Sequence, residues 1–210
     1  MFWKDGDKAM MIIGLTGGIG MGKSTAARIM RGFGFPVHDA DAVVHDLLAP
    51  NGAAADQVAE LFPDAVRHYW DGRGVIKRRV LAKIVYENPD SLKKLESVLH
   101  PLVREAEREF FEEAQRKKAR AVVLDIPLLY ETGAEARCDV VLCMSAPEAV
   151  RRARVMKRAD MTQEKLEAIL ARQLPEAEKK RRADYVIPSG KGMSAMRKAL
   201  KEALIEIGIL

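Results

Sequence analysis

A glycine-rich motif constrains the fold of this chain most strongly. Residues 17–24 read GGIGMGKS, which fits the pattern G-x-x-x-x-G-K-[ST]. The apolar run Met11 to Leu15 precedes the motif, and a pattern with helical spacing follows it as far as Gly34. Glycines permit positive φ angles, so successive main-chain N–H groups can converge on phosphate oxygens at the start of the helix. The motif therefore predicts a phosphate-binding loop between a strand and a helix.

The end of this loop carries side chains with expected tasks. We expect the Lys23 ammonium to lie between the terminal phosphates of a bound nucleotide and the Ser24 hydroxyl to ligate Mg²⁺. Thr25 is expected to support the loop from the first turn of the helix. The residues expected to bind the nucleotide are Gly17, Gly18, Ile19, Gly20, Met21, Gly22, Lys23, Ser24 and Thr25.

The composition is typical of a soluble globular protein. The chain has 210 residues, of which 48% are hydrophobic and 31% are charged, so it can bury a sizeable core. Its longest uncharged apolar runs are far shorter than the roughly 20 residues of a membrane helix. Only Cys138 and Cys143 are present, and their spacing favours a reducing cytoplasm over a disulfide framework. Residues 1–9 lack the apolar region of a secretory signal, and we expect a frayed tail there.

Strands and helices alternate in the first and last parts of the chain. The expected buried strands are Met11–Leu15, Pro36–His38, Ala121–Ile126, Asp139–Met144 and Tyr185–Ile187. The expected helices are Lys23–Phe33, a helix from about Asp41 to Pro50, Glu148–Arg158, Gln163–Leu174 and Ser194–Ile207. This order predicts an α/β fold with a five-stranded parallel sheet flanked by helices. Between Ala53 and Gln115 we expect helices without strands, broken at Pro63, at Asp71–Gly74, near Pro89 and at Pro101.

Three acidic residues fall at the carboxyl ends of expected strands, where ligands of open parallel sheets gather. Asp39 and Asp41 follow the second strand, and Asp125 lies in the third. We expect Asp41, more than Asp39, to orient an attacking hydroxyl and accept its proton, and Asp125 to hold Mg²⁺ directly or through water. Asp41 as a helix N-cap and Asp125 as a solvent-facing residue are the alternatives.

The stretch from Arg151 to Arg182 is dense in Lys and Arg. Its pattern of helix, short break and helix comes after the fourth strand, where P-loop kinases carry a mobile lid. Guanidinium groups in a lid can brace the transferred phosphoryl group and exclude water. Arg154 and Arg158 are the candidates for this task, and surface salt bridging is the alternative for each.

Taken together, these motifs resemble the dephospho-coenzyme A kinase family nearly end to end. The matching segments are residues 14–20, 23–25, 39–41, 99–102, 125–131, 151–158, 173 and 183–187. The resemblance implies transfer of phosphate from ATP, with Mg²⁺, to the ribose 3′-hydroxyl of dephospho-CoA, the final step of coenzyme A biosynthesis. It also implies a single P-loop kinase domain over 1–210, with a core at 10–50, 118–150 and 183–210, a helical CoA-binding insert at about 53–117 and a lid at about 151–182.

The resemblance assigns roles to particular residues. It implies that Asp41 is the general base and that Arg154 and Arg158 lie in the lid. The acceptor side is expected to include Asp39, Arg79, His100 and Pro101, although His100 is equally well explained as a buried structural histidine.

Two positions depart from the family pattern. The family usually has serine where Met21 stands, a position expected to contribute only its N–H. After the last strand the family usually has an Asn close to a Gly near the ATP adenine, whereas residues 188–192 read PSGKG. Any change in donor preference is expected in this segment.

Other classes of function fit less well. Another small P-loop kinase, acting on a nucleoside, a nucleoside monophosphate or a hydroxylated metabolite, is the main alternative. A GTP-binding switch needs an N-K-x-D segment, which the sequence lacks. The net charge is only +5 and aromatic residues make up 6%, so stacking platforms for nucleic acid are scarce. We therefore expect no nucleic-acid or membrane partner, and a monomer or weak homo-oligomer.

Overall fold

The structure is a computed structural model that describes residues 10–69, 74–159 and 161–210. The tail expected at residues 1–9 and most of the break expected at Asp71–Gly74 lie outside the described residues. The chain divides into two compact units. The core unit comprises the chain up to His38 together with Ala114–Leu210, and the inserted unit comprises Asp39–Glu113.

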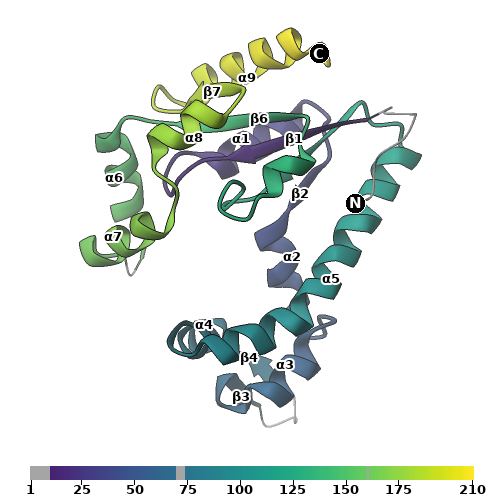
Figure 1. Ribbon diagram of the computed structural model, residues 1–210, viewed down its shortest axis with the longest axis vertical. Helices are drawn as coiled ribbons and strands as arrows, with labels where there is room; N and C mark the ends of the chain where they lie inside the picture. The colour runs from purple at the N-terminus through teal and green to yellow at the C-terminus, as the bar shows by residue number, and fades with distance from the viewer. Residues whose placement is uncertain (1–9, 70–73, 160) are drawn as a thin grey trace. The chain divides into compact units, whose positions relative to one another are not determined.

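A five-stranded parallel sheet forms the centre of the core unit, with the order β2-β5-β1-β6-β7 (Figure 1). Its strands are β1 Met11–Thr16, β2 Val37–Asp39, β5 Ala121–Asp125, β6 Val140–Ser145 and β7 Tyr185–Pro188. The register pairs Leu15 with Asp125 and Thr16 with Cys143, so neighbouring strands end at the same edge. The predicted α/β fold with a five-stranded parallel sheet is therefore confirmed.

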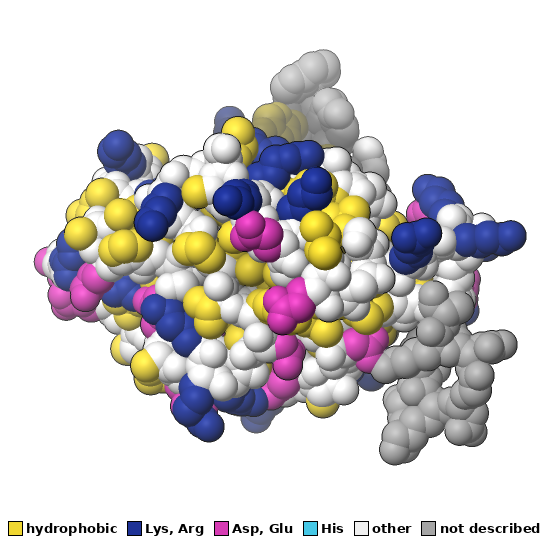
Figure 2. Space-filling model, turned by 90° about the horizontal axis from the view of Figure 1, so that it is seen from above, with side chains coloured by type: hydrophobic (Ala, Val, Ile, Leu, Met, Phe, Trp, Pro, Cys, Tyr) yellow, Lys and Arg dark blue, Asp and Glu magenta, His cyan; other side chains and the backbone are white. Residues whose placement is uncertain are grey.

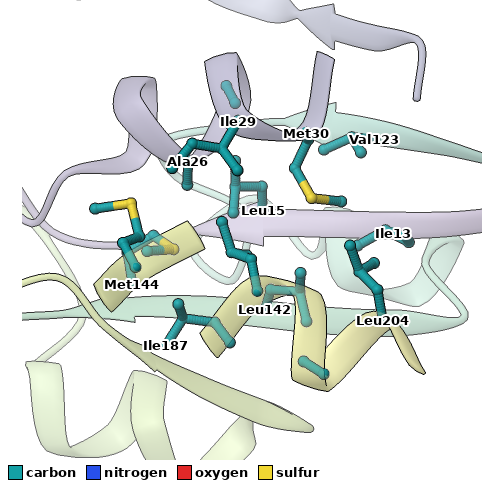
Figure 3. Packing of buried hydrophobic residues seen from close by; sticks show 14 of the residues in the cluster. Ile13, Leu15, Ala26, Ile29, Met30, Val123, Leu142, Met144, Ile187 and Leu204 are labelled. Carbon is teal, nitrogen blue, oxygen red and sulfur yellow. The ribbon is translucent and has the colours of Figure 1, made fainter. Parts of the chain in front are cut away.

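Helices α1 (Lys23–Gly32) and α9 (Met193–Ile207) supply the apolar core on one face of this sheet. Ile13 and Leu15 alternate along β1 and point into this core, which Figure 3 shows between the strands and the two helices. Met196, Leu200 and Leu204 recur at helical spacing on α9 and are all buried there. Burying such a side chain contributes about 1.5–3 kcal/mol, so the predicted amphipathic pattern fixes α9 to the sheet.

The opposite face of the sheet is covered by the segment that follows β5 and by the helix Glu176–Arg182, which directly precedes β7. A Cβ added at Gly14 of β1 would lie 2.8 Å from Cys138 Sγ and 3.1 Å from Leu129, so the glycine permits this close approach. A second buried cluster forms here around Leu129 and Tyr130. The remaining elements of the core unit are the 3₁₀ helix η2 Ala134–Arg137 and the helices α6 Glu148–Met156, α7 Gln163–Arg172 and α8 Glu176–Arg182 (Figure 1).

The inserted unit has an apolar core of its own. Its elements are α2 Ala40–Leu47, α3 Ala55–Leu61, the 3₁₀ helix η1 Pro63–Ala65, β3 Val66–His68, β4 Gly74–Ile76, α4 Arg78–Glu87 and all but the last turn of α5 Pro89–Arg116. Val58, Phe62, Leu81 and Leu99 are among the buried residues that pack together there. None of the helices in the described ranges combines the length and the apolar character that a membrane crossing requires.

Two expectations for this stretch are wrong. β3 and β4 form an antiparallel pair, with Val66 opposite Ile76, although no strand was expected. Strands of three residues are too short for an alternating pattern to stand out. Pro101 does not break its helix, because α5 continues from Pro89 to Arg116. Leu99 and Leu102 pack into the core on both sides of Pro101, which offsets the cost of about 3 kcal/mol for an interior proline.

Candidate active site

The predicted phosphate loop, residues 17–24, joins β1 to α1. Gly20 and Gly22 adopt φ angles of +76° and +89°, in the left-handed region that favours glycine. A Cβ at Gly20 would lie 2.6 Å from Val155 Cγ2 and 3.0 Å from the Arg151 carbonyl oxygen. Both the backbone angle and the close approach of α6 therefore require glycine at position 20.

Several main-chain amides of this loop are available to an anion. The amides of Gly20, Gly22, Lys23 and Ser24 have no hydrogen-bond partner among the residues that the structure describes. Gly22 is the N-cap of α1 and provides no side-chain cap. Unpaired N–H groups at a helix N-terminus attract negative charge. The loop can therefore bind phosphate oxygens, as the motif predicts.

Two other loop amides are already engaged. Met21 N donates to the Gly18 carbonyl at 3.1 Å, and Ile19 N donates to Gln173 Oε1 at 3.1 Å. Met21 was expected to contribute only its N–H to a ligand, and this expectation is wrong. Its side chain is fully buried in the main core, and its Sδ accepts a hydrogen bond from Ala146 N at 3.2 Å.

Lys23 and Asp125 are brought together by neighbouring strands. Lys23 Nζ lies 2.5 Å from Asp125 Oδ1, and the Asp125 side chain is only 2% exposed. The alternative of a solvent-facing Asp125 is therefore wrong, because β5 ends beside β1 in the interior of the sheet. Ser24 is exposed in the first turn of α1.

Mg²⁺ fits the oxygen donors near this loop better than a metal ion that takes all of its ligands from the protein. Within the described ranges, no group of three or more His, Cys, Asp or Glu side chains could hold a metal ion. Magnesium commonly uses one or two protein oxygens together with substrate phosphates and water. The Ser24 hydroxyl and the Asp125 carboxylate provide donors of this kind.

Arg154 and Arg158 have different surroundings. Arg154 Nη2 donates to the Ser189 carbonyl at 2.6 Å, and Nη1 donates to Ser189 Oγ at 3.1 Å and to the Gly20 carbonyl at 3.3 Å. Arg154 is therefore part of the loop's support, not of a surface salt bridge. Arg158 follows α6 with an exposed side chain that has no partner in the described part of the chain.

The two aspartates after β2 have distinct positions. Asp39 is the N-cap of α2, and its Oδ1 accepts a hydrogen bond from Ala42 N at 3.0 Å. Asp41 lies in the first turn of α2 and is exposed. The alternative that Asp41 caps this helix is therefore wrong, because the extended backbone that suits a cap ends at Asp39.

The other expected acceptor-side residues lie in the inserted unit. Arg79 is exposed on α4, and His100 and Pro101 are exposed on α5. The alternative of a buried His100 is wrong, because its neighbour Leu99 faces the core and successive helical residues point about 100° apart. The structure thus gathers the phosphate loop, Asp125 and Arg154 in the core unit, and Asp41, Arg79, His100 and Pro101 in the inserted unit.

Comparison with known proteins identifies the family. The family model for dephospho-CoA kinase matches residues 11–194, which include most of both units. The chain belongs to the dephospho-CoA kinase family. A dephospho-CoA kinase of Brucella melitensis is 46% identical over 195 residues, covering 93% of this chain and 94% of the relative. That of Paramagnetospirillum magneticum is 50% identical over 171 residues, covering 81% and 78%.

Solved structures agree with this assignment. A Thermus thermophilus protein aligns with a TM-score of 0.78 and 40% identity, covering 94% of this chain and 98% of the other. The dephospho-CoA kinase of Campylobacter jejuni aligns with a TM-score of 0.66 and 27% identity, covering 93% and 96%. The inserted unit is therefore part of what dephospho-CoA kinases share, and the chain is a phosphotransferase of this family.

Sequence reasoning missed contacts that link the two positions at which this chain departs from the family pattern. Ser189 is fully buried, and its Oγ donates to the Met21 carbonyl at 2.6 Å. Gly22 and Ser189 pack tightly, since a Cβ at Gly22 would lie 3.2 Å from Ser189 Cβ. The unusual residues at positions 21 and 189 are the only signal for this contact in the sequence.

Proposed function

We propose that this chain transfers the γ-phosphoryl group of ATP to the ribose 3′-hydroxyl of dephospho-CoA, which gives coenzyme A. The observation that carries the proposal is the set of amides of Gly20, Gly22, Lys23 and Ser24, which have no partner among the described residues, beside a Lys23 ammonium held against buried Asp125. A polyphosphate tail offers the anionic oxygens that these groups bind. Membership of the dephospho-CoA kinase family supports the choice of acceptor.

The Lys23 and Asp125 pair supports a role in phosphoryl transfer. The Lys23 ammonium is directed by Asp125 and is only 15% exposed, so it loses little freedom when it contacts a phosphate. Ser24 and Asp125 would hold Mg²⁺, directly or through water, and the bound cation would neutralise phosphate charge. The protein's own contribution is to position phosphates and to stabilise developing charge.

Asp41 is the proposed general base. Its exposed carboxylate is not required as a helix cap, because Asp39 performs that task. Asp41 is therefore free to accept a hydrogen bond from the 3′-hydroxyl and then its proton. We place Arg79, His100 and Pro101 on the acceptor side, since they lie exposed on α4 and α5 of the inserted unit.

Arg154 and Arg158 are proposed to act from the lid, residues 151–182. Arg158 has an exposed guanidinium without a partner among the described residues, so it is available to contact the transferred phosphoryl group. Arg154 fixes the Gly20 carbonyl from behind the loop. Both arginines would then stabilise the transition state. Arg158 would do so by its charge, and Arg154 by holding the phosphate loop in its binding conformation.

The proposed partners are small molecules. On the face shown in Figure 2, Lys and Arg side chains lie among acidic and hydrophobic ones and do not form one continuous basic surface, which supports a function without nucleic acid. We further propose a cytoplasmic monomer or weak homo-oligomer without a membrane partner. Light scattering after size exclusion tests the oligomeric state.

A coupled ADP-release assay tests the function. The purified protein is given ATP and Mg²⁺ with dephospho-CoA, adenosine, AMP or shikimate. ADP release that depends on dephospho-CoA, and its loss in Lys23→Ala, support the proposal. Faster release with any of the other three acceptors points to another small P-loop kinase and overturns it.

A further inference from the structure

The joint between α7 and α8 contacts the phosphate loop through one side chain. Gln173, which ends α7, accepts a hydrogen bond from Ile19 N at its Oε1 atom, 3.1 Å away. The same oxygen lies 3.3 Å from where a Cβ at Gly18 would be. The amide of Gln173 is therefore packed against the loop as well as bonded to it.

A buried ion pair holds the next residue of the joint. Leu174 N donates to Glu131 Oε1 at 2.7 Å, and Lys179 Nζ lies 2.7 Å from the same oxygen. The Lys179 side chain is only 1% exposed, so its charge depends on Glu131 for compensation. Burial alone raises the pKa of the Glu131 carboxyl, but the hydrogen bonds from Lys179 and Leu174 outweigh it and lower this pKa below its ordinary value.

The beginning of α8 is also attached to the sheet. Ser145, the last residue of β6, donates to Glu176 Oε1 at 2.8 Å. Leu174 packs against the buried cluster that contains Leu129 and Tyr130. The joint is therefore fixed by polar and apolar contacts on the same side of the sheet, although it falls within the stretch expected to be a lid.

We propose that Gln173 both positions the phosphate loop and binds the donor nucleotide, and that Glu131 and Lys179 hold it in place through Leu174. Its Oε1 fixes the Ile19 amide, and its Nε2 has no partner among the described residues. In the proposal, this free Nε2 donates to a phosphate oxygen of the nucleotide. A glutamine can perform both tasks because its side-chain amide has an acceptor at one atom and donors at the other. This inference rests on the proposed function for the identity of the donor.

Variants at position 173 separate the two tasks. Gln173→Ala removes both, so we expect hydrogen exchange in the 17–23 segment of nucleotide-free protein to rise about tenfold and the KM for ATP to rise about tenfold. The kcat is expected to change by less than about threefold. Gln173→Glu keeps an acceptor for Ile19 but lacks the donor, so it restores slow exchange and leaves the KM high. The matched control is Gln115→Ala, an exposed glutamine at the end of α5.

A double-mutant cycle tests the link to Glu131. Glu131→Met removes the acceptor of Leu174 N and the charge that compensates Lys179, so we expect a KM for ATP several-fold above wild type. In the Gln173→Ala background the same change is expected to have almost no further effect on KM, because Glu131 acts through Gln173. Glu178→Met on α8 is the matched control, since Glu178 forms an exposed ion pair with Arg181 at 2.6 Å. Glu131→Met/Lys179→Met removes both buried charges together with the acceptor of Leu174 N, and it replaces the single variant if that variant fails to fold.

Each outcome of these experiments either supports or overturns the proposed role of Gln173. Unchanged exchange at residues 17–23 in Gln173→Ala, or additive effects on KM in the cycle, would overturn the proposal. Faster exchange with non-additive KM effects would support it. Failure of the proposed function would appear separately, as wild-type protein that does not phosphorylate dephospho-CoA. The exchange experiment would still decide the Oε1 contact, because it contains no nucleotide.

Discussion

Lys23 and Asp125 join the start of α1 to the end of β5 through a 2.5 Å contact between ammonium and carboxylate. These residues are far apart in the sequence, and the pairing of β1 with β5 brings them together. The ammonium is thereby directed before phosphate binding, so little of its side-chain entropy remains to be lost. The contact makes Lys23 the residue whose loss should harm transfer most directly.

Lys23→Ala is expected to lower kcat/KM for ATP by at least about 100-fold, because it removes charge stabilisation of the transferred group. The far-ultraviolet circular dichroism spectrum should remain that of the wild type. Lys198→Ala is the matched control, since Lys198 is exposed on α9. Turnover close to wild type in Lys23→Ala would contradict the role assigned to this residue.

Asp41→Asn is expected to affect kcat and not stability, whereas Asp39→Ala is expected to affect stability. Asp41→Asn should reduce kcat by about 100-fold or more with little change in Tm, because it removes the proposed base but no cap. Asp39→Ala should lower the free energy of unfolding by about 1 kcal/mol, because it removes the side-chain bond to Ala42. Kinetics and thermal melts of both variants distinguish the roles. A large loss of Tm in Asp41→Asn with normal kcat would favour a structural role for Asp41.

Gly20→Ala is expected to prevent ATP binding. The residue needs a φ of +76°, and the new Cβ would collide with Val155 of α6. Gly34→Ala is the matched control, because Gly34 has a φ of +92° but nothing within 4 Å of its Cβ position. The control should lose only about 1–2 kcal/mol of stability, from backbone strain alone. Calorimetric titration with ATP that gave wild-type affinity for Gly20→Ala would show that the loop tolerates a side chain.

The stabilising effect of Glu131 should depend on pH. Its folded-state pKa is lowered by Lys179 and Leu174 against the effect of burial, so its contribution is present above the unfolded pKa and lost as pH falls through the folded pKa. The Tm difference between wild type and Glu131→Gln should be large at about pH 7 and small at about pH 3. Glu178→Gln should change Tm little at either pH, and a difference for Glu131→Gln that stayed constant would contradict this assignment.

The sequence predicts the core unit well and the inserted unit less well, for physical reasons. Apolar runs such as 121–126 and the spacing of Met196, Leu200 and Leu204 report burial directly, so the sheet and α9 are confirmed. The sequence pattern does not predict the β3–β4 pair, because each strand has only three residues. Pro101 gives a misleading signal because packing on both sides of it outweighs the local helix preference.

The site, too, has residues that a local sequence pattern identifies and residues that it does not. Lys23 and Asp125 are predictable because a motif identifies the first and a strand end identifies the second. The contacts of Ser189 with Met21 and of Gln173 with Ile19 span more than 150 residues of sequence. Each is a hydrogen bond between a side chain and the backbone of the loop, and no local pattern in a single sequence predicts such a tertiary contact. Asp39 as the cap of α2 depends on where the extended backbone ends, which sequence spacing leaves uncertain by a few residues.

A crystal structure with a non-hydrolysable ATP analogue and Mg²⁺ tests the central claim most directly. We predict phosphate oxygens within about 2.7–3.2 Å of the amides of Gly20, Gly22, Lys23 and Ser24, with Lys23 Nζ in contact with the terminal phosphates. An analogue whose phosphates bind elsewhere, while these amides contact no ligand, would contradict the account.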